Sequence, residues 1–305
     1  MNLGIVFTVL FVIAAAARDV LFGGLFQAYR FFDIVLVAFG LAGVFFLSLV
    51  AWRQPEQFAA LRRTWKDCVI ANVGTAAAWT SFFFALKILE PAIVNTIHTG
   101  TGSVTLVILG ALGFHVAKKA RIRAREWVLQ LGVLAALVAL AAVVLLDLSG
   151  LRGRATGENL VGLALAFASG VFISLTSDVT KRMHERGVTA EGVLAVRFWA
   201  GIVLAALMVA AGVGDGRPLA DPASLATVGA AGFLLIVLPL YLFQLGLART
   251  SAVSVWVIQA VGPCLVFAGQ LLDGRLTPSA WTLAAIAAYS VLVIAAALSR
   301  KYERA

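Results

Sequence analysis

The chain has 305 residues, of which 62% are hydrophobic and 13% are charged, and it carries a formal net charge of +9. The charged share is about half of that in soluble proteins, and a water-soluble fold could not bury so much apolar surface. The basic residues gather in short loops, which is the placement expected of loops facing anionic lipid headgroups rather than of a nucleic-acid site. The composition therefore predicts an all-α integral membrane protein in contact with membrane lipids, with no nucleic-acid partner.

Ten apolar segments follow one another, most of them long enough to cross a hydrocarbon core of roughly 30 Å as a helix. They are residues 3–22, 32–52, 67–88, 91–113, 127–146, 159–181, 189–212, 223–246, 252–272 and 279–298. Pro91 suits the first turn of a new helix and separates the third segment from the fourth. The first segment has no basic stretch before it, so we expect a retained helix rather than a signal peptide. So many spans leave little chain for a soluble domain, and we expect the function inside the membrane.

Lys and Arg are unevenly divided between the two alternating sets of loops. The loops after the second, fourth, sixth and eighth segments, together with the C-terminus, hold 16 of them, and the opposite set holds 7. The larger set includes the runs from Lys118 to Arg125 and from Arg300 to Arg304, and the smaller set includes Arg18 and Arg275. Because strongly basic loops stay in the cytoplasm, this count predicts that both termini are cytoplasmic.

A weak internal repeat relates the two halves of the chain. Residues 85–97 align with residues 245–257 at an offset of 160, so that Ala92 meets Ala252 and Gly102 meets Gly262. This match places the third and fourth segments on the eighth and ninth, and it divides the chain into five spans in residues 1–150 and five in residues 151–305. An odd number of spans in each half gives the halves opposite orientations, and inverted repeats of this kind bind substrate near the bilayer midplane.

The same features resemble a known family. The ten spans, the inverted repeat and the run from Leu245 to Pro263, a short turn followed by an apolar helix with a central Gly-Pro, resemble the EamA-type members of the drug/metabolite transporter superfamily. Within that group the chain is most similar to bacterial aromatic amino-acid exporters. The resemblance implies a monomeric or homodimeric secondary transporter of the inner membrane. One departure is the run from Gly100 to Ser103, where the family often has proline, so the two halves need not bend alike.

Polar residues form a stripe on the fourth segment. Asn95, His98, Thr99, Gly102 and Thr105 recur at three- and four-residue spacing, which puts them on one helix face. Such a face lines a cavity or packs against another helix. His98 is the most informative member, because a neutral imidazole can both donate and accept a hydrogen bond; a structural role for it is the alternative.

The ninth segment carries a similar stripe, with Trp256, Gln259, Pro263 and Gln270. Further residues deep in other segments complete a predicted pocket lined by aromatic side chains, amides and hydroxyls: Trp79, Phe83, Ser177, Tyr241 and Gln244. This lining suits a solute with a flat apolar side chain, although each aromatic residue could instead pack in the core. Hinges are expected at Gly100, Gly102, Pro239 and Pro263.

The acidic residues are interpreted from their positions in the segments. Asp178 is expected to form an ion pair with Arg197, since an unpaired buried carboxylate is unfavourable; binding of a substrate ammonium is the alternative. Asp19, Glu90 and Glu191 fall near predicted helix ends and are expected to reach water.

The residues that are missing narrow the substrate. Arg197 is the one cation expected deep in the membrane, which argues against phosphorylated substrates, and no carboxylate is expected at the centre for large aromatic cations. No P-loop, HExxH or nucleophile motif occurs, so we expect no enzyme activity, cofactor or metal. The sequence thus predicts an exporter of aromatic and other hydrophobic amino acids. A multidrug or other small-metabolite exporter, a membrane-embedded lipid enzyme and a structural subunit are the alternatives.

Overall fold

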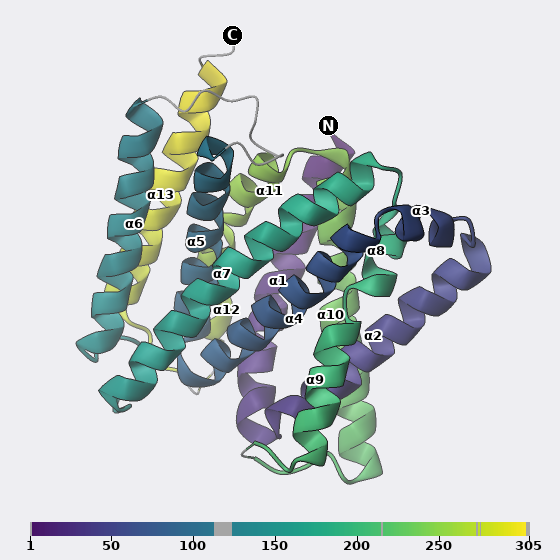
Figure 1. The fold of residues 1–305 in the computed structure, drawn as a ribbon. Coiled ribbons are helices and arrows are strands. Elements are labelled where there is room, and N and C mark those ends of the chain that lie inside the picture. Colours follow the sequence, from purple (N-terminus) through teal and green to yellow (C-terminus); the bar gives the residue numbers. More distant parts are fainter. Residues whose placement is uncertain (1, 113–123, 215, 273, 275, 303–305) are drawn as a thin grey trace.

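The computed structural model describes residues 2–112, 124–214, 216–272, 274 and 276–302. Of the basic run from Lys118 to Arg125, residues 118–123 lie outside these residues, as do Arg275 and Arg304. The described part forms a bundle of helices (Figure 1). They are α1 (Leu3–Ala28), α2 (Phe31–Arg53), α3 (Gln57–Arg63), α4 (Trp65–Ile88), α5 (Pro91–Ala111), α6 (Ala124–Leu145), α7 (Thr156–Glu185), α8 (Ala190–Val196), α9 (Trp199–Ala210), α10 (Pro222–Arg249), α11 (Ala252–Gln259), α12 (Gly262–Gln270) and α13 (Ala280–Tyr302).

Eight helical stretches within the described residues are long and apolar enough to cross a membrane. One of them is the pair α8 and α9 taken together, and two shorter apolar stretches cover Ser254–Gln270 and Ala280–Ala296. Large hydrophobic side chains such as Val44, Val138 and Val291 are exposed on the outer helix faces, where lipid rather than water is the favourable neighbour. A helical, multi-pass membrane protein is therefore the coarse architecture.

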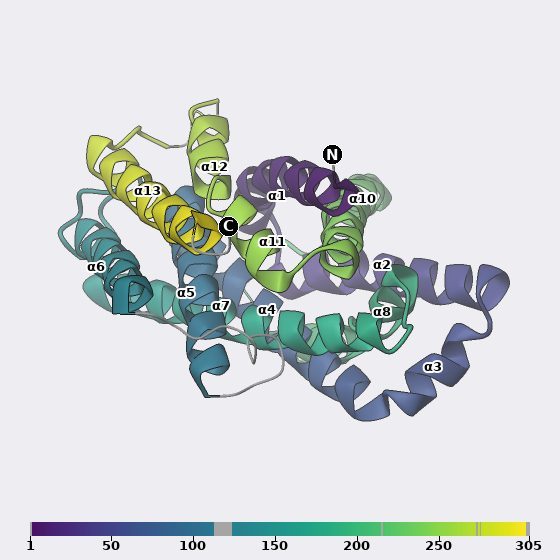
Figure 2. The same ribbon diagram turned by 90° about the horizontal axis from the view of Figure 1, so that it is seen from above.

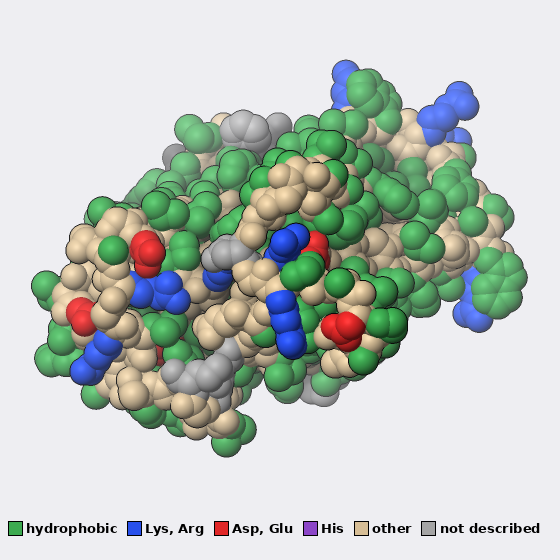
Figure 3. Space-filling view, turned by 90° about the horizontal axis from the view of Figure 1, so that it is seen from below, with side chains coloured by type: hydrophobic (Ala, Val, Ile, Leu, Met, Phe, Trp, Pro, Cys, Tyr) green, Lys and Arg blue, Asp and Glu red, His purple; other side chains and the backbone are tan. Residues whose placement is uncertain are grey.

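Both termini lie at one end of the bundle, together with α3 and the turn between α10 and α11 (Figures 1 and 2). The turns that join α1 to α2, α4 to α5 and α9 to α10 lie at the other end. Figure 3 shows this second end, where charged side chains sit among polar ones and hydrophobic side chains border them. Charged ends and apolar sides are the distribution that a bilayer selects.

Each predicted segment lies on a helix, but two of them are broken. The seventh is interrupted at Arg197 and Phe198, between α8 and α9, and the ninth at Ala260 and Val261, between α11 and α12. In the turn that opens α12, Pro263 contributes no backbone N–H, so the break lies next to the predicted proline hinge. By contrast, α5 is continuous through Gly100 and Gly102, and α10 is continuous through Pro239.

Side chains from neighbouring helices satisfy the backbone groups that the two breaks release. At the first break, the Asn72 amide donates to the Val196 carbonyl at 2.6 Å and accepts from the Ala200 N–H at 2.7 Å. At the second, the Ser290 hydroxyl donates to the Ala260 carbonyl at 2.8 Å. Irregular backbone at membrane depth is tolerated where protein partners replace the missing helical bonds, which is what these two side chains do.

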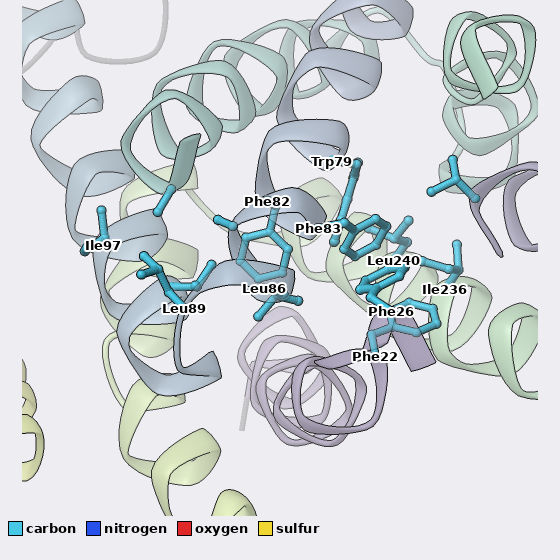
Figure 4. Packing of buried hydrophobic residues seen from close by; sticks show 14 of the residues in the cluster. Phe22, Phe26, Trp79, Phe82, Phe83, Leu86, Leu89, Ile97, Ile236 and Leu240 are labelled. Carbon is cyan, nitrogen blue, oxygen red and sulfur yellow. The ribbon is translucent and has the colours of Figure 1, made fainter. Parts of the chain in front are cut away.

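An aromatic core packs α1 against α4 (Figure 4), and buried residues of α2 belong to the same hydrophobic cluster. The ring of Phe83 lies 5.0 Å from that of Phe26 and 5.2 Å from that of Phe22, and Trp79 adjoins it at 5.0 Å. Tilted and edge-on contacts at these distances are the favourable arrangements for aromatic rings. This core fixes α4, and with it the position of Trp79, beside the pocket described next.

Candidate functional site

A pocket lies among α1, α4, α5, α7, α10, α11 and α12. Its lining combines apolar and polar side chains: Phe11, Val12, Ala15, Arg18, Trp79, Asn95, His98, Thr99, Ile173, Leu240, Phe243, Trp256, Gln259 and Gly262. Six of the predicted substrate-binding residues are among them, namely Trp79, Asn95, His98, Thr99, Trp256 and Gln259.

Gly102 lies on the same face of α5 as His98, and it allows close packing of neighbouring side chains. A Cβ atom at this position would lie 2.4 Å from the Trp256 ring and 2.9 Å from the Ser174 hydroxyl. A Cβ at Gly100 would lie 2.7 Å from a methyl carbon of Leu137. Both glycines therefore allow neighbouring side chains to approach α5 closely. This close packing accounts for glycine at the two positions, and no hinge is needed to explain it.

The feature that the sequence interpretation missed is the pair Arg18 and Asp19, near the middle of α1. Asp19 Oδ1 accepts from Arg18 Nε at 2.8 Å and lies 2.7 Å from Nη2, and the Arg18 guanidinium stands 4.5 Å from the centre of the Trp79 ring. Asp19 is fully buried and Arg18 is 4% exposed, so the expectation that Asp19 reaches water is wrong. The helix continues to Ala28, six residues beyond the predicted end, which moves the pair from a helix end to its centre.

Asn95 and His98 each use one polar atom for a neighbouring helix. The Asn95 amide donates to Asp19 Oδ2 at 2.6 Å, while its Oδ1 is buried without a hydrogen-bond partner. Ser169 donates to the Ala166 carbonyl at 2.7 Å, so its oxygen accepts from His98 Nδ1, 2.9 Å away. The neutral imidazole then carries its proton on Nδ1, and Nε2 is left as an acceptor.

Four donors of the pocket lining are buried and have no hydrogen-bond partner among the described residues: Arg18 Nη1, Trp79 Nε1, Trp256 Nε1 and Gln259 Nε2. A buried donor without a partner is unfavourable by about 1–3 kcal/mol, so a group of them in one pocket is the arrangement of a site that receives an acceptor. Thr99 differs, because it donates to the Asn95 carbonyl and accepts from Tyr289 at 3.2 Å.

Four of the predicted binding residues lie outside the pocket. Phe83 packs in the aromatic core, and the Ser177 hydroxyl donates to the Ile173 carbonyl of its own helix. Tyr241 donates to Glu191 at 2.6 Å, and Gln244 contacts His184 at 2.9 Å. On α10 the pocket face is formed by Leu240 and Phe243 instead, three residues apart, and the adjacent positions point about 100° away from it.

The predicted ion pair between Asp178 and Arg197 is replaced by other contacts. Asp178 lies 4.0 Å from Arg182, one turn along α7. Arg197 is fully buried at the break between α8 and α9, where its Nε donates to Thr75 at 3.0 Å, and both of its Nη atoms are without a hydrogen-bond partner. The break turns Arg197 toward α4, a contact that an uninterrupted helix did not predict.

Ionic and polar clusters join helices at the two ends of the bundle. Asp67, at the start of α4, accepts from Arg182 at 2.7 Å and from Arg186 at 2.9 Å. At the other end Glu90 is 1% exposed, so the expectation that it reaches water is also wrong. Its carboxylate accepts from the Gly150 N–H at 2.8 Å, from the Thr282 hydroxyl at 3.3 Å and from the Gln270 amide. Burial raises the pKa of Glu90, and these donors oppose that rise.

Comparisons with known proteins bear on the fold alone. No family model matches the sequence, and no curated protein matches it. A solved structure described only as "Crystal structure of protein" aligns with 99% of this chain and 97% of its own, with a TM-score of 0.66 and 22% sequence identity. At this identity the similarity shows that the whole chain adopts a fold already seen in a crystal.

Proposed function

We propose that this protein is a secondary transporter of the EamA type in the drug/metabolite superfamily. It exports aromatic and other hydrophobic amino acids across the bacterial inner membrane. The observation that carries the proposal is the pocket in the middle of the bundle, where two tryptophans and three other groups with unpartnered polar atoms meet. A closed structural subunit would use these atoms in helix contacts, whereas a transporter keeps them for its substrate.

The helix packing supports an inverted repeat of five and five spans. With α4 corresponding to α10, and α5 to α11 and α12, the remaining correspondence is α1 to α7, α2 to α8 and α9, and α6 to α13. The contacts follow this scheme: α4 packs on α7 as α10 packs on α1, and α5 packs on α7 as α12 packs on α1. The self-related pairs α6 with α13 and α2 with α9 are also in contact. Such a repeat permits two equivalent states that open to opposite sides.

The two closures at the ends of the bundle support alternating access. The Asp67 cluster joins α4 to α7 at the end of the termini, and the Glu90 cluster joins the turn before α5 to α12 and α13 at the other end. Breaking one cluster while the other holds would expose the pocket to one side at a time. Both termini are cytoplasmic in this proposal, so the Asp67 cluster is the cytoplasmic closure.

Efflux of aromatic cations is the second candidate, and Asp19 is the observation that favours it. A carboxylate in the middle of a spanning helix is what a cationic drug would bind. Both oxygens of Asp19 are already engaged, however, one by Arg18 and one by Asn95. A neutral pair of this kind is a weaker attraction for a cation than an isolated carboxylate, which favours amino acids.

Uptake of radiolabelled phenylalanine and tryptophan into proteoliposomes tests the proposal. Saturable uptake is expected, and Trp256→Ala should reduce it at least 10-fold, since the indole lines the pocket. Tyr241→Phe is the matched control, because Tyr241 is an aromatic residue on the neighbouring face of α10. Saturable transport of an aromatic cation such as ethidium, with no flux of either amino acid, would replace this function with drug efflux.

A further inference from the structure

The guanidinium of Arg18 offers one unused edge to the pocket. Asp19 Oδ1 occupies the side formed by Nε and Nη2, and the face of the group rests on the Trp79 ring. Nη1 is buried and has no hydrogen-bond partner, although Arg18 lines the pocket. Because a guanidinium can bind two carboxylates along different edges, the contact with Asp19 leaves it able to bind another.

The pocket around Arg18 contains both further donors and acceptors. The indole N–H groups of Trp79 and Trp256 and the amide of Gln259 are further donors without a partner. Asn95 Oδ1 and His98 Nε2 are acceptors, the first unpartnered and the second left by the tautomer that Ser169 selects. An α-amino acid presents the complementary groups, one carboxylate and one ammonium.

The net charge of the pair favours a zwitterion over a doubly charged ligand. Arg18 and Asp19 together are neutral, and a zwitterion adds no net charge to a pocket in the middle of a membrane-spanning helix. A phosphate ester would add up to two negative charges there, next to a guanidinium whose charge Asp19 already compensates. The apolar residues Phe11, Ile173 and Phe243 are then available for the ligand's side chain.

We propose that Arg18 is the carboxylate-binding residue of this pocket, and that its Nη1 edge receives the carboxylate of an aromatic amino acid. Asn95 Oδ1 and His98 Nε2 receive the ammonium. The inference rests on the proposed function for the identity of the substrate, but its test is a binding measurement that needs no transport.

The test uses three ligands with the same phenethyl skeleton and four forms of the full-length protein. Phenylalanine, 3-phenylpropionate and phenethylamine share the aromatic ring and the two-carbon chain. Phenylalanine carries both charges, 3-phenylpropionate only the carboxylate and phenethylamine only the ammonium. Their affinities are measured by calorimetry on purified wild type, Arg18→Lys, the double variant Arg18→Gln with Asp19→Asn, and Arg53→Gln. The double variant removes both charges of the pair, so that neither is left unpaired. Arg53→Gln is the matched control, since Arg53 also stands over a tryptophan ring, that of Trp52, but at the end of α2.

The double variant is expected to bind phenylalanine and 3-phenylpropionate at least about 10-fold more weakly, with phenethylamine affinity changed by less than about 3-fold. Arg18→Lys keeps the positive charge but lacks the planar guanidinium edge, so its affinity for the two carboxylates should lie between those of wild type and the double variant. The affinities of Arg53→Gln should match those of wild type. Equal affinity of the wild type and the double variant for both carboxylates would overturn the proposal. So would an equal loss for all three ligands, or no binding of either carboxylate to wild type.

Flux measurements separate the failure of this inference from failure of the proposed function. Binding that depends on Arg18, with no phenylalanine flux in proteoliposomes, would reject the transporter and retain the carboxylate site. Phenylalanine flux that the double variant leaves unchanged would retain the transporter and reject the role of Arg18.

Discussion

Two buried carboxylates in this protein lie in opposite kinds of surroundings. Glu90 accepts three hydrogen bonds, from Gly150, Gln270 and Thr282, and links four segments at one end of the bundle. Asp19 shares the centre of α1 with Arg18, and the group around this pair retains buried donors and an acceptor without partners. Both carboxylates are buried. The polar atoms around Glu90 have hydrogen-bond partners, whereas several polar atoms around Arg18 and Asp19 have none.

The difference separates groups that serve the fold from groups that serve a ligand. A buried charge is tolerated when every surrounding polar atom is satisfied, and then it stabilises one arrangement of the chain. An incomplete set in the middle of a long apolar helix gives no such benefit to the fold, and in the proposed function its remaining atoms bind the transported solute. Changes at the two sites should therefore affect different measurements.

The largest effect on stability is expected for Arg18→Gln alone. This change leaves the Asp19 carboxylate buried with Asn95 as its single charge-stabilising partner, and breaking a buried pair in this way costs about 3–5 kcal/mol. Thermal unfolding in detergent should show a large drop in Tm, which the additional change Asp19→Asn largely restores. If Arg18→Gln alone were as stable as the double variant, Arg18 would not be needed to compensate the charge of Asp19.

Gly102→Ala should disturb the pocket through packing. The new methyl group would overlap the Trp256 ring, 2.4 Å away, and overpacking of this kind costs about 1–3 kcal/mol. Because Trp256 must move, phenylalanine affinity should fall together with Tm. Gly40→Ala is the control, since nothing lies within 4 Å of a Cβ there and alanine favours the helix. Equal behaviour of the two variants would contradict the close contact between α5 and α11.

Glu90→Ala should lower stability without changing ligand affinity. It leaves the Gly150 N–H and the Gln270 amide without their acceptor, a loss of about 1–3 kcal/mol. Phenylalanine binding to the folded variant should match that of wild type, because Glu90 is not among the residues that line the pocket. A loss of affinity comparable to that of the Arg18 variants would remove the distinction between the two sites.

Glu90 also predicts a dependence of stability on pH. Burial raises its pKa above the ordinary value of 4.5, so the folded state takes up the proton at a higher pH than the unfolded state does. As pH falls through this raised pKa toward 4.5, the stability of wild type relative to Glu90→Gln should increase, and below 4.5 it should level off. A relative stability that instead decreases as pH falls below 4.5 would show that the hydrogen-bond donors outweigh burial.

The smallest effect is expected for Tyr241→Phe. The change removes the hydrogen bond to Glu191 but lies outside the pocket, so transport should stay within about 2-fold of wild type while Tm falls slightly, by the equivalent of about 1 kcal/mol. Uptake reduced as strongly as by Trp256→Ala would return Tyr241 to the binding site.

The sequence alone predicts the helices well, because segments of about 20 apolar residues have one stable form in a bilayer. It also predicts the pocket residues of α5, since Asn95, His98 and Thr99 share one face of an uninterrupted helix. The sequence does not identify the pair Arg18 and Asp19, because the predicted end of the first segment lies six residues too early. The helix continues to Ala28, which places the pair near the helix centre instead of near its end.

Other misses arise where helical phase or helix breaks decide the neighbours. Tyr241 and Gln244 lie at the level of the pocket along α10, but Leu240 and Phe243 are the residues that face it. The rotation of α10 about its own axis is fixed by its packing against α1, which the sequence of α10 alone does not predict. Arg197 lies at a break whose own segment has no proline, and the nearest glycines of that segment, Gly192 and Gly201, stand several residues away from it. The side chain that stabilises this break, Asn72, is more than a hundred residues away in the chain.

The most direct test of the central claim asks whether the pocket is a substrate site that opens to both sides. Ala15→Cys, in a background with Cys68 and Cys264 replaced by Ala, places one thiol on the pocket wall. We predict labelling by a membrane-impermeant maleimide from either side of oriented vesicles, and protection from both sides by phenylalanine. Labelling from both sides that phenylalanine does not slow, or no labelling from either side in a folded protein, would contradict a midplane site with alternating access.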